Sequence, residues 1–472
     1  MTISRRAFLA GGSAAFFASG CRTAGGWFGG SPDLRFGVVS DIHVTTPESC
    51  ARFERALRYF RGRGVDAVMV PGDLTDWGLK ASLVYVKETW DRVFAGTGVV
   101  PLFITGNHDY EGWCYGDMTM EMHANGYSER DRLVRLEGGI AAGWEAVFGE
   151  KFAPVRVRTV KGYDFVSAEW QGFGDFPAWM AANGARFRGS KPFFFFQHPP
   201  AKGTTSDSYR WADEGCAFRA LKDFPNAIAF TGHAHTPFFD ERSIWQGEFT
   251  AVAVPSLSYA STPADCENSY AERTGKATHA MPIVPTRRDL CGGMGYVVSV
   301  WPHEMTIERL DLEEGVEAAA TWVVPLPTTG ERPYDLLKRG ERSVPPEFPA
   351  GAKLVLSTRN TETRQGKWVI VLDCQFPSAT MPDGSRVYDY EIRAVPKDGS
   401  APLVRRFLSP AFAKPAKCEP AMQRFWFDVA ALPQGKPYVI EAYARNCFGK
   451  VSVALKSRIR QGLPGLAQVD RS

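Results

Sequence analysis

Short apolar runs rich in β-branched and aromatic residues recur along the first half of the chain and predict buried β-strands. Five of them are each followed directly by a polar motif: Phe36–Val39, Ala67–Val70, Val99–Ile104, Phe193–Phe196 and Ala227–Phe230. Between the first two runs, the apolar residues of Pro47–Gly62 recur at three- and four-residue steps, which predicts an amphipathic helix. The order strand, helix, strand is that of a β-α-β unit. We therefore expect an α/β fold whose polar motifs lie at the carboxyl ends of buried strands.

After residue 235 the pattern favours β-structure alone. Strands are predicted at Thr250–Val254, Gly295–Trp301 and Met305–Leu310, and the last two are expected to pair. By contrast, Cys114–Phe152 contains aromatic residues and glycines without a clean period. We expect that stretch to form an insertion or a lid near the functional site. The first folded domain is predicted to span residues 34–321.

The C-terminal part of the chain reads as a linker followed by a second domain. Residues 322–352 contain six prolines among scattered charges, which is the composition of a linker. Residues 353–458 then hold short alternating runs with turn residues between them, which predicts a small all-β sandwich. The predicted strands are Lys353–Ser357, Lys367–Asp373, Tyr388–Val395 and Tyr438–Ala444. The stretch from Tyr438 to Asn446 resembles the penultimate strand of a fibronectin type III domain, and residues 459–472 form a tail.

The first 21 residues are expected to be a targeting signal. Ser4-Arg5-Arg6-Ala7-Phe8-Leu9 resembles a twin-arginine export signal, and the uncharged stretch that follows is too short for a membrane span. Ala18-Ser19-Gly20-Cys21 resembles a bacterial lipobox, so Cys21 is expected to carry a lipid; the alternative is an ordinary cleaved signal peptide without one. Residues 22–33 are Gly-rich and read as a tether. The predicted location is periplasmic or at the cell surface, with membrane attachment if Cys21 is lipidated.

Length, charge and cysteine content narrow the class of protein. A chain of 472 residues is too long for one ordinary core and predicts two or three domains. The formal net charge of +3 gives no indication of nucleic-acid binding by a basic surface. Of the nine cysteines, the eight besides Cys21 could pair in an oxidising compartment or remain buried thiols. The absence of a C-x-x-C motif makes a zinc-finger or thioredoxin role improbable.

The polar motifs that follow the strands supply carboxylate, amide and imidazole groups. In chain order they are Asp41-Ile42-His43, Gly72-Asp73-Leu74-Thr75-Asp76, Gly106-Asn107-His108-Asp109, Gln197-His198-Pro199 and Gly232-His233-Ala234-His235. These side chains are usual ligands of divalent metals of hard to borderline character. Five of the eight histidines fall in these motifs. We therefore expect a site for two divalent metal ions at the carboxyl ends of the strands.

Taken together, the motifs resemble the pattern of the calcineurin-like metallophosphoesterases: D-x-H, G-D, G-N-H-D/E, a lone H and G-H-x-H. The resemblance spans roughly residues 34–312. It implies a four-layer α/β/β/α sandwich, here followed by the small all-β sandwich. It also implies an exported two-metal hydrolase that cleaves phosphomonoester or phosphodiester bonds with a metal-bound hydroxide.

The resemblance implies a role for each residue of the motifs. The first metal would be held by Asp41, His43 and His235, the second by Asn107, His198 and His233, and both by the bridging Asp73. His108 would face the phosphate and stabilise or protonate the leaving oxygen, and Asp109 would orient the His108 ring. Zinc, manganese and iron all suit such mixed ligands, so the identity of the two metals stays open.

The chain departs from the purple acid phosphatases, which carry a Tyr three residues after the bridging Asp. Asp76 occupies that position here, and those enzymes lack a counterpart of His43. The D-x-H and G-N-H-D forms are closer to the cyclic-nucleotide phosphodiesterase branch and to exported phosphoesterases without assigned activity. An exported enzyme rarely meets intracellular cyclic AMP, so the substrate, a phosphoester, stays open.

Other residues near the motifs allow two interpretations. Trp77, Tyr110, Trp113 and Tyr115 follow ligand motifs and would either line a pocket that stacks a base or sugar, or belong to the core. His123, His279 and His303 lie outside the motifs and are expected to be ordinary surface residues, although His123 falls in the expected lid.

Two rival functions remain besides hydrolysis. The first is a catalytically silent scaffold or cell-surface binding protein on the same fold. Such a protein would be expected to have lost ligands, whereas this chain keeps all seven and His108. The second is an adhesion protein whose C-terminal sandwich is the working part. The sequence does not indicate an oligomeric state.

Overall fold

The first of two large sheets contains the strands that precede the first three motifs. The computed structural model describes residues 30–110, 139–206, 208, 211–261, 266–267, 292–362, 367–412, 420–458 and 460–461. The strands of this sheet are β1 (Leu34–Val38), β2 (Ala67–Pro71), β3 (Val100–Ile104), β10 (Met294–Val300), β11 (Glu304–Asp311) and β12 (Val316–Pro325), in the order β12-β11-β10-β1-β2-β3. Strands β1, β2 and β3 are parallel, and β10 to β12 continue the sheet antiparallel. The predicted strands and the predicted pairing of the last two are confirmed.

The second sheet carries the remaining two motifs. Its strands are β4 (Val155–Val160), β5 (Tyr163–Ala168), β6 (Phe193–Gln197), β7 (Ala227–Thr231), β8 (Ile244–Gln246) and β9 (Thr250–Ala253), in the order β4-β5-β6-β7-β9-β8. Strands β5, β6, β7 and β9 run parallel, with antiparallel strands at both edges. Parallel strands buried on both faces read as continuous apolar runs, which is why β6 is Phe-rich without alternation.

Successive phenylalanines of β6 point into different layers, because side chains alternate along a strand. Phe194 belongs to the core between the two sheets, where its ring lies 4.9 Å from that of Phe36 in β1. Phe195 points the other way and stacks on Phe176 of α7 (Phe176–Asn183), with the ring centroids 4.0 Å apart. One strand therefore joins the inter-sheet core to the helical layer outside it.

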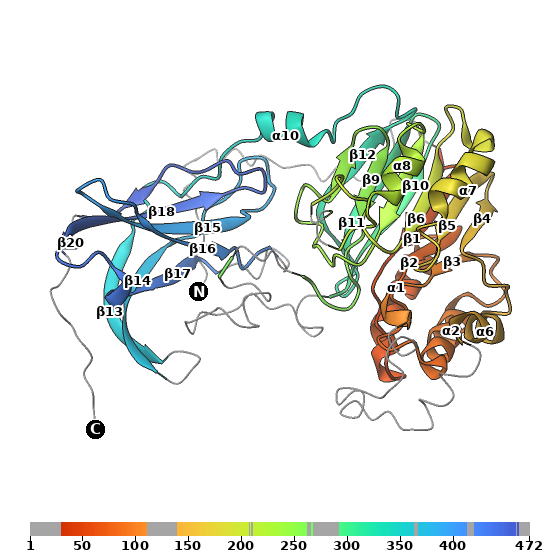
Figure 1. Cartoon of the computed structure of the whole chain (residues 1–472), viewed down its shortest axis with the longest axis horizontal. Helices are drawn as coiled ribbons and strands as arrows, with labels where there is room; N and C mark the ends of the chain where they lie inside the picture. The colour runs from red at the N-terminus through yellow and green to blue at the C-terminus, as the bar shows by residue number, and fades with distance from the viewer. Residues whose placement is uncertain are drawn as a thin grey trace, which may run out of the picture. The chain divides into compact units, whose positions relative to one another are not determined.

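Helices cover the outer face of each sheet, so the domain has the expected four layers. Helices α1 (Ala51–Gly62), α2 (Lys80–Phe94) and α6 (Gly139–Phe148) share a core with β2 and β3. The turn η2 (Gly184–Phe187) and α8 (Cys216–Leu221) join α7 against β6 and β7. Figure 1 shows the first three helices grouped together, apart from α7 and α8. The predicted helix at Pro47–Gly62 is confirmed as η1 (Glu48–Cys50) followed by α1.

The C-terminal region forms two antiparallel sheets, as the alternating pattern predicts. The first has the order β13-β14-β17, with β13 (Val355–Glu362), β14 (Trp368–Pro377) and β17 (Met422–Asp428). The second has the order β16-β15-β18-β19, with β15 (Asp389–Pro396), β16 (Leu403–Leu408), β18 (Pro437–Arg445) and β19 (Leu455–Lys456), and β20 (Arg460–Gln461) also pairs with β18. Phe407 of one sheet stacks on Phe425 of the other at 4.3 Å, within a shared core. A turn η5 (Val429–Ala431) follows β17.

Two predicted irregular stretches contain regular structure. The predicted linker at 322–352 begins inside β12 and contains α10 (Leu336–Arg342), whose first turn is capped by Asp335 accepting from the Lys338 amide at 3.1 Å. The expected lid, Cys114–Phe152, contains α6 near its end. Residues 111–138, which include Trp113, Tyr115 and His123, lie outside the described residues. The domain boundaries themselves stay predictions.

Other predictions concern the cysteines and the N-terminus. Cys50, Cys216, Cys266 and Cys374 are buried thiols rather than disulfides, which favours the buried-thiol alternative for these four, and Cys447 is a half-buried thiol. Within the described ranges, no helix combines the length and the apolar composition that crossing a bilayer requires. The predicted signal, Cys21 and His279 lie outside the described residues.

Candidate metal centre

The five motifs lie together because backbone hydrogen bonds tie the strand ends of both sheets to one another. After β1, Ser40 forms an isolated parallel bridge with Ser256, which follows β9 in the other sheet. The Ile42 amide donates to the carbonyl of Asp73 at 2.8 Å, and the Gly232 amide donates to the carbonyl of His198 at 3.0 Å. The loops that carry the predicted ligands are therefore fixed against each other by the backbone and do not depend on a bound ion for their approach.

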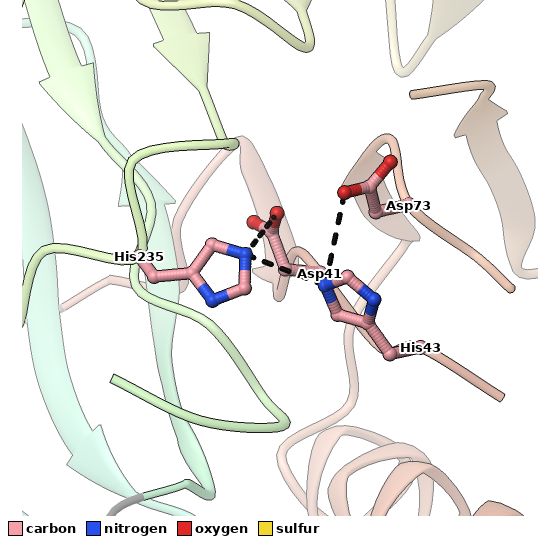
Figure 2. Close-up of side chains that lie close together, drawn as sticks. All are labelled: Asp41, His43, Asp73 and His235. Atoms are coloured by element: carbon pink, nitrogen blue, oxygen red, sulfur yellow. Dashed lines mark hydrogen bonds and ion pairs between the residues drawn. The ribbon is translucent and has the colours of Figure 1, made fainter. Parts of the chain in front are cut away.

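The first cluster consists of Asp41, His43, Asp73 and His235, and all four side chains are buried. The Nε2 atom of His235 lies 2.9 Å from Asp41 Oδ1 and 3.3 Å from Nε2 of His43. His43 Nε2 also lies 3.7 Å from Oδ2 of Asp73. Figure 2 shows the two imidazoles and the two carboxylates pointing toward one another from the loops after β1, β2 and β7. This is the residue set predicted for the first metal, with the bridging carboxylate beside it.

The second cluster consists of Asp73, His198 and His233, with Asn107 next to it. His198 Nε2 lies 3.1 Å from Asp73 Oδ2 and 3.1 Å from the amide oxygen of Asn107. The His233 amide donates to the Asp41 carboxylate at 3.1 Å, which places this residue between the two clusters. Because Asp73 belongs to both groups, the structure brings all seven predicted ligands into two adjoining sets that share one carboxylate.

The ring nitrogens that face the clusters are the ones left to bind a metal, because the opposite nitrogens donate elsewhere. Nδ1–H of His43 donates to Asp76 Oδ1 at 2.6 Å, that of His198 to the Pro71 carbonyl at 2.8 Å, and that of His235 to the Tyr259 carbonyl at 2.9 Å. These acceptors orient each ring, as outer partners of metal-binding histidines do. Nε2 of each ring is then the nitrogen that faces the clusters.

Such an arrangement of acceptors needs positive charge between them. Two imidazole lone pairs face each other at 3.3 Å between His43 and His235. Oδ2 of Asp73 is buried and accepts no hydrogen bond, although His198 lies beside it. Buried acceptors without a donor are costly, and a divalent cation or a proton is what relieves them. The residues present therefore fit two divalent metal ions.

The backbone at these positions is unusual. Asp41, His43, Asp73, His233 and His235 all adopt positive φ, between 51° and 67°. Few non-glycine residues occupy this left-handed region, and strained conformations of this kind concentrate at functional sites. In the described part of the chain only three other non-glycine residues do so, Lys161, Trp211 and Glu214. The conformation turns each ligand side chain inward directly after its strand has ended.

Two motif glycines are required by close approach of the ligands. A Cβ on Gly106 would lie closer than 3.0 Å to the carboxylate and backbone of Asp73. A Cβ on Gly72, where φ is 96°, would overlap the ring of His198 in the same way. Real Cβ atoms essentially never come that close, so the glycines of the G-D and G-N-H-D motifs leave the space that the bridging carboxylate and His198 occupy.

Burial and the neighbouring charges shift the pKa values of the ligands in opposite directions. Burial alone would raise the pKa of Asp41, but His235 and His198 outweigh it and lower the pKa to about 2. Asp73 shows the same balance, with His198 holding its pKa well below the ordinary value. Burial lowers the pKa of His233 to about 3, helped by His198. His198 itself has its pKa raised to about 9, because Asp73 and Asp41 outweigh its burial. The two carboxylates are therefore ionised and His233 is neutral at neutral pH, the forms that bind metal.

His108 lies beside the first cluster, with its ring centroid 4.6 Å from that of His43. Its amide donates to Asp73 Oδ1 at 3.0 Å, and its Nδ1–H donates to the carbonyl of Asp76 at 3.1 Å. With Nδ1 held in this way, Nε2 is the nitrogen left to meet a substrate oxygen. This geometry suits the predicted role at the leaving group, and His108 also lies with His43 and Asp76 in a third group of possible metal ligands.

The Asp109 carboxylate is held by the loop after β2, while its predicted role in orienting the His108 ring stays a prediction. The Asp109 carboxylate accepts from the amides of Leu74, Thr75 and Gly106 at 2.8 to 3.1 Å, and from the Thr75 hydroxyl at 2.8 Å. Its chain position in a tight turn aims the carboxylate back at the loop after β2. Burial raises the pKa of Asp109 to about 7, and Asp73 adds to the rise. Asp109 therefore joins the loops that carry Asp73 and Asn107, and Asp76 orients the histidine rings.

The aromatic residues expected to line a pocket are not those found at the centre. Tyr110 is buried in the core with α1 and α2, and its hydroxyl lies 3.3 Å from that of Thr105, so the core alternative holds for it. No ring contact of Trp77 with a ligand is found within the described ranges. Three other rings lie against the ligands: Trp170, Trp211 and Tyr259. His303 is exposed in the turn between β10 and β11, as expected.

Several residues that support the ligands were not found from the sequence. Asp76 lies in the second motif, three residues after Asp73, and this spacing was the available signal for it. The carbonyls of Pro71 and Tyr259 could not have been found, because a backbone acceptor can belong to any residue type. Glu169 directly follows β5, and its carboxylate accepts from the Thr105 amide at 2.7 Å and from Arg156. It thereby fixes the start of the loop that carries Asn107.

Comparison with known proteins identifies one family. Residues 34–237 match the family model described as calcineurin-like phosphoesterase, and this segment includes all seven ligands and His108. No curated protein sequence matches the chain.

Solved structures with similar folds are remote in sequence. A conserved uncharacterised protein, a predicted phosphoesterase from Streptococcus pneumoniae TIGR4, has 13% identity and a TM-score of 0.28, over 62% of this chain and 97% of its own. GAP50, the anchor in the inner membrane complex of Plasmodium, has 11% identity and a TM-score of 0.32, over 62% of this chain and 88% of its own. The purple acid phosphatase PPD1 from yellow lupin (Lupinus luteus) seeds has 11% identity and a TM-score of 0.35, over 61% of this chain and 53% of its own.

Proposed function

We propose that residues 34–237, which belong to the calcineurin-like phosphoesterase family, form with the strands that follow an exported two-metal hydrolase of phosphomonoesters or phosphodiesters. The observation that carries this proposal is the sharing of Asp73 between two ligand clusters. A single buried carboxylate that faces imidazole lone pairs on both sides is the arrangement that holds two divalent cations close together. Zinc, manganese and iron remain the candidate metals, because the ligands are nitrogen and oxygen atoms.

In the proposed reaction, the chain supplies a fixed cradle for the cations and one proton-transfer group. Two divalent cations, when bound, supply positive charge for the phosphate oxygens and a hydroxide at neutral pH. Asp41, Asp73 and the histidines are already held by the backbone and by their outer acceptors, so little reorganisation is needed on binding. The Nε2 atom of His108 would give a proton or a hydrogen bond to the leaving oxygen.

The proposal is tested by restoring metals to chelator-treated protein. Hydrolysis of p-nitrophenyl phosphate and of bis-p-nitrophenyl phosphate is followed with added Mn²⁺, Zn²⁺ or Fe²⁺. We expect turnover of at least one substrate that depends on metal, and a stoichiometry of two ions per chain. The Asp73→Asn variant serves as the inactive control. If the protein binds two ions but hydrolyses neither of these esters nor any member of a wider panel of phosphoesters, the catalytically silent scaffold is favoured instead.

The adhesion alternative is separated by truncation. Removing residues 345–472 deletes the C-terminal sheets and leaves the whole segment that matches the family. We expect the truncated protein to keep metal-dependent hydrolysis. The adhesion alternative predicts that the full chain binds surfaces but hydrolyses no ester. It also predicts that the truncated protein no longer binds surfaces.

Export is proposed on sequence grounds, from the Arg5-Arg6 pair and the motif that ends at Cys21. The twin-arginine route carries folded proteins, which would allow the metal centre to be filled before export. Changing both arginines to lysine should leave folded, active precursor inside the cell. Cys21→Ala should move the mature protein from the membrane fraction to the soluble fraction. Unchanged export of the first variant would indicate another route, and unchanged membrane association of the second would exclude a lipid on Cys21.

A further inference from the structure

Two tryptophans flank His233, the ligand at the outer side of the second cluster. The centroid of the Trp170 ring lies 5.6 Å from that of His233, and the centroid of the Trp211 ring lies 5.7 Å from it, both at tilted angles. Trp170 also lies 5.8 Å from the ring of His198. The two tryptophans come from different loops, after β5 and after β6, so their meeting at one ligand is a feature of the fold and not of one short segment.

Trp170 is held firmly in place. It packs against the core that α1 and α2 share, its amide donates to the Thr105 hydroxyl at 3.4 Å, and its ring lies 5.5 Å from Phe173. The residue before it, Glu169, is one of the buried carboxylates of the protein and binds the Thr105 amide. Trp170 therefore forms a fixed wall behind His198 and His233.

Trp211 differs from Trp170 in exposure and in backbone conformation. Its side chain is 49% exposed, the largest exposed fraction of the rings that contact the ligands, and its φ of 60° lies in the left-handed region. A bulky aromatic residue rarely adopts this conformation, and the conformation turns the indole toward His233. The exposed part of this large apolar ring lies beside the predicted ligand His233, where a bound molecule can contact it.

The loop that presents Trp211 is anchored two residues further on. The buried Asp213 carboxylate accepts from the Gln197 side chain at 3.0 Å, from the Lys202 amide at 3.1 Å and from the Ala217 amide at 2.6 Å. These contacts join the end of β6, the middle of the loop and the start of α8. Because Gln197 directly precedes the ligand His198, the position of Trp211 is fixed relative to the second cluster.

We infer that Trp211 is a specificity residue, and that the substrate is a phosphoester with a planar aromatic ring within reach of its phosphate. The inference rests on the proposed function. A phosphate held at the second cluster places its substituent beside His233, where the exposed indole face offers a stacking surface. Planar rings stack on indole faces through dispersion and quadrupole interactions. These interactions need only an aromatic face, so they do not select one kind of ring. A nucleobase and a simple aryl group both satisfy this chemistry.

Competition between matched ligands tests the inference without assuming a monoester or a diester substrate. The assay follows hydrolysis of whichever nitrophenyl ester the protein cleaves faster. Inhibition constants are measured for adenosine 5′-phosphate and for ribose 5-phosphate, which share a phosphate and a sugar and differ in the base. Phenyl phosphate and methyl phosphate form a second pair that differs only in the ring. We expect the ring-bearing member of at least one pair to inhibit more strongly, and the pair that shows it identifies the base or the aryl group as the ring.

Substitution of Trp211 should remove this preference. Trp211→Ala should lower the preference ratio by roughly 5- to 150-fold, the range that loss of base–aromatic stacking gives. Trp211→Phe should keep most of it, because it retains an aromatic face. Trp368 of β14 is 67% exposed and lies in the C-terminal sheets, so Trp368→Ala is the matched control and should keep the full ratio.

The outcomes separate this inference from the proposed function. If the metal-loaded protein hydrolyses neither nitrophenyl ester nor any ester of the wider panel, the proposed function fails, and the inference that rests on it fails with it. If it hydrolyses one of them but neither pair shows a preference for the ring, the inference alone is overturned. The same holds if the preference survives in Trp211→Ala with two metals still bound.

Discussion

Removing the Asp76 carboxylate tests whether the partners behind the ligands determine metal affinity. Asp76 Oδ1 accepts from Nδ1–H of His43 at 2.6 Å, a short distance for a bond between a ring N–H and a carboxylate. His43 is fully buried and the Asp76 side chain is 16% exposed, so water competes little for this bond. Without the acceptor, the His43 ring can rotate and its Nε2 loses basicity. Asp76→Ala should therefore weaken the first metal position.

The size of the effect follows from the nature of the contact. Loss of an outer partner of a metal-binding histidine typically reduces metal affinity by about 10- to 100-fold, or about 1.4 to 2.7 kcal/mol. The short, shielded bond at Asp76 places the Ala variant near the upper end of that range. Asp76→Asn keeps an oxygen acceptor without the charge and should fall near the lower end. His108 should keep its position in both variants, because it binds the Asp76 main-chain carbonyl.

The assay is calorimetric titration of chelator-stripped protein with Zn²⁺, resolved into two binding steps, together with metal content after dialysis. Asp91→Ala is the control, because Asp91 is an exposed carboxylate on α2 that pairs with Lys87. The control should bind both ions like the unchanged protein. Equal weakening of both steps in Asp76→Ala, or affinities within twofold of the unchanged protein, would refute the reasoning.

Four further substitutions test other parts of the account. Asp73→Asn should reduce metal content at both positions and abolish turnover, and a variant that retained two ions and near-normal rates would exclude the bridging role. His108→Ala should keep both ions and lose about 10²- to 10⁴-fold in rate, most for esters with high-pKa leaving groups; an equal loss for all leaving groups would point to phosphate binding. Gly106→Ala should displace the Asp73 carboxylate and so lower metal content in a folded protein, as judged by circular dichroism and metal analysis. Phe195→Ala should destabilise the protein by about 3–5 kcal/mol in urea unfolding, because the ring is fully buried against Phe176.

The sequence predicted the residues of the site more completely than the strands and helices around it. The ligand motifs follow apolar runs, and runs such as Ala67–Val70 and Ala227–Phe230 lie within the observed strands. Parallel strands bring their carboxyl ends to one edge, so the convergence of the ligands follows from the order of the elements. The strands β4 and β5 were missed, although the alternation of apolar residues with Arg156 and Arg158 in β4 is the pattern of a half-buried strand.

The sequence could not predict which residues contact the predicted ligands from outside the two clusters. The role of Asp109 came from the family resemblance, whereas its contacts with the amides of Leu74 and Thr75, which are distant in the chain, could not be read from the motif. The aromatic residues near the ligands were sought beside the motifs, whereas Trp170 and Trp211 come from other loops. Side-chain direction after a strand depends on φ of single residues, and no pattern of apolar positions encodes it.

The central claim is that Asp73 bridges two metal ions, and anomalous diffraction from crystals grown with Mn²⁺ or Zn²⁺ tests it most directly. The account predicts two anomalous peaks, one beside Asp41, His43 and His235 and the other beside Asn107, His198 and His233, each within bonding distance of an Asp73 oxygen. A single peak, or two peaks of which only one contacts Asp73, would contradict it.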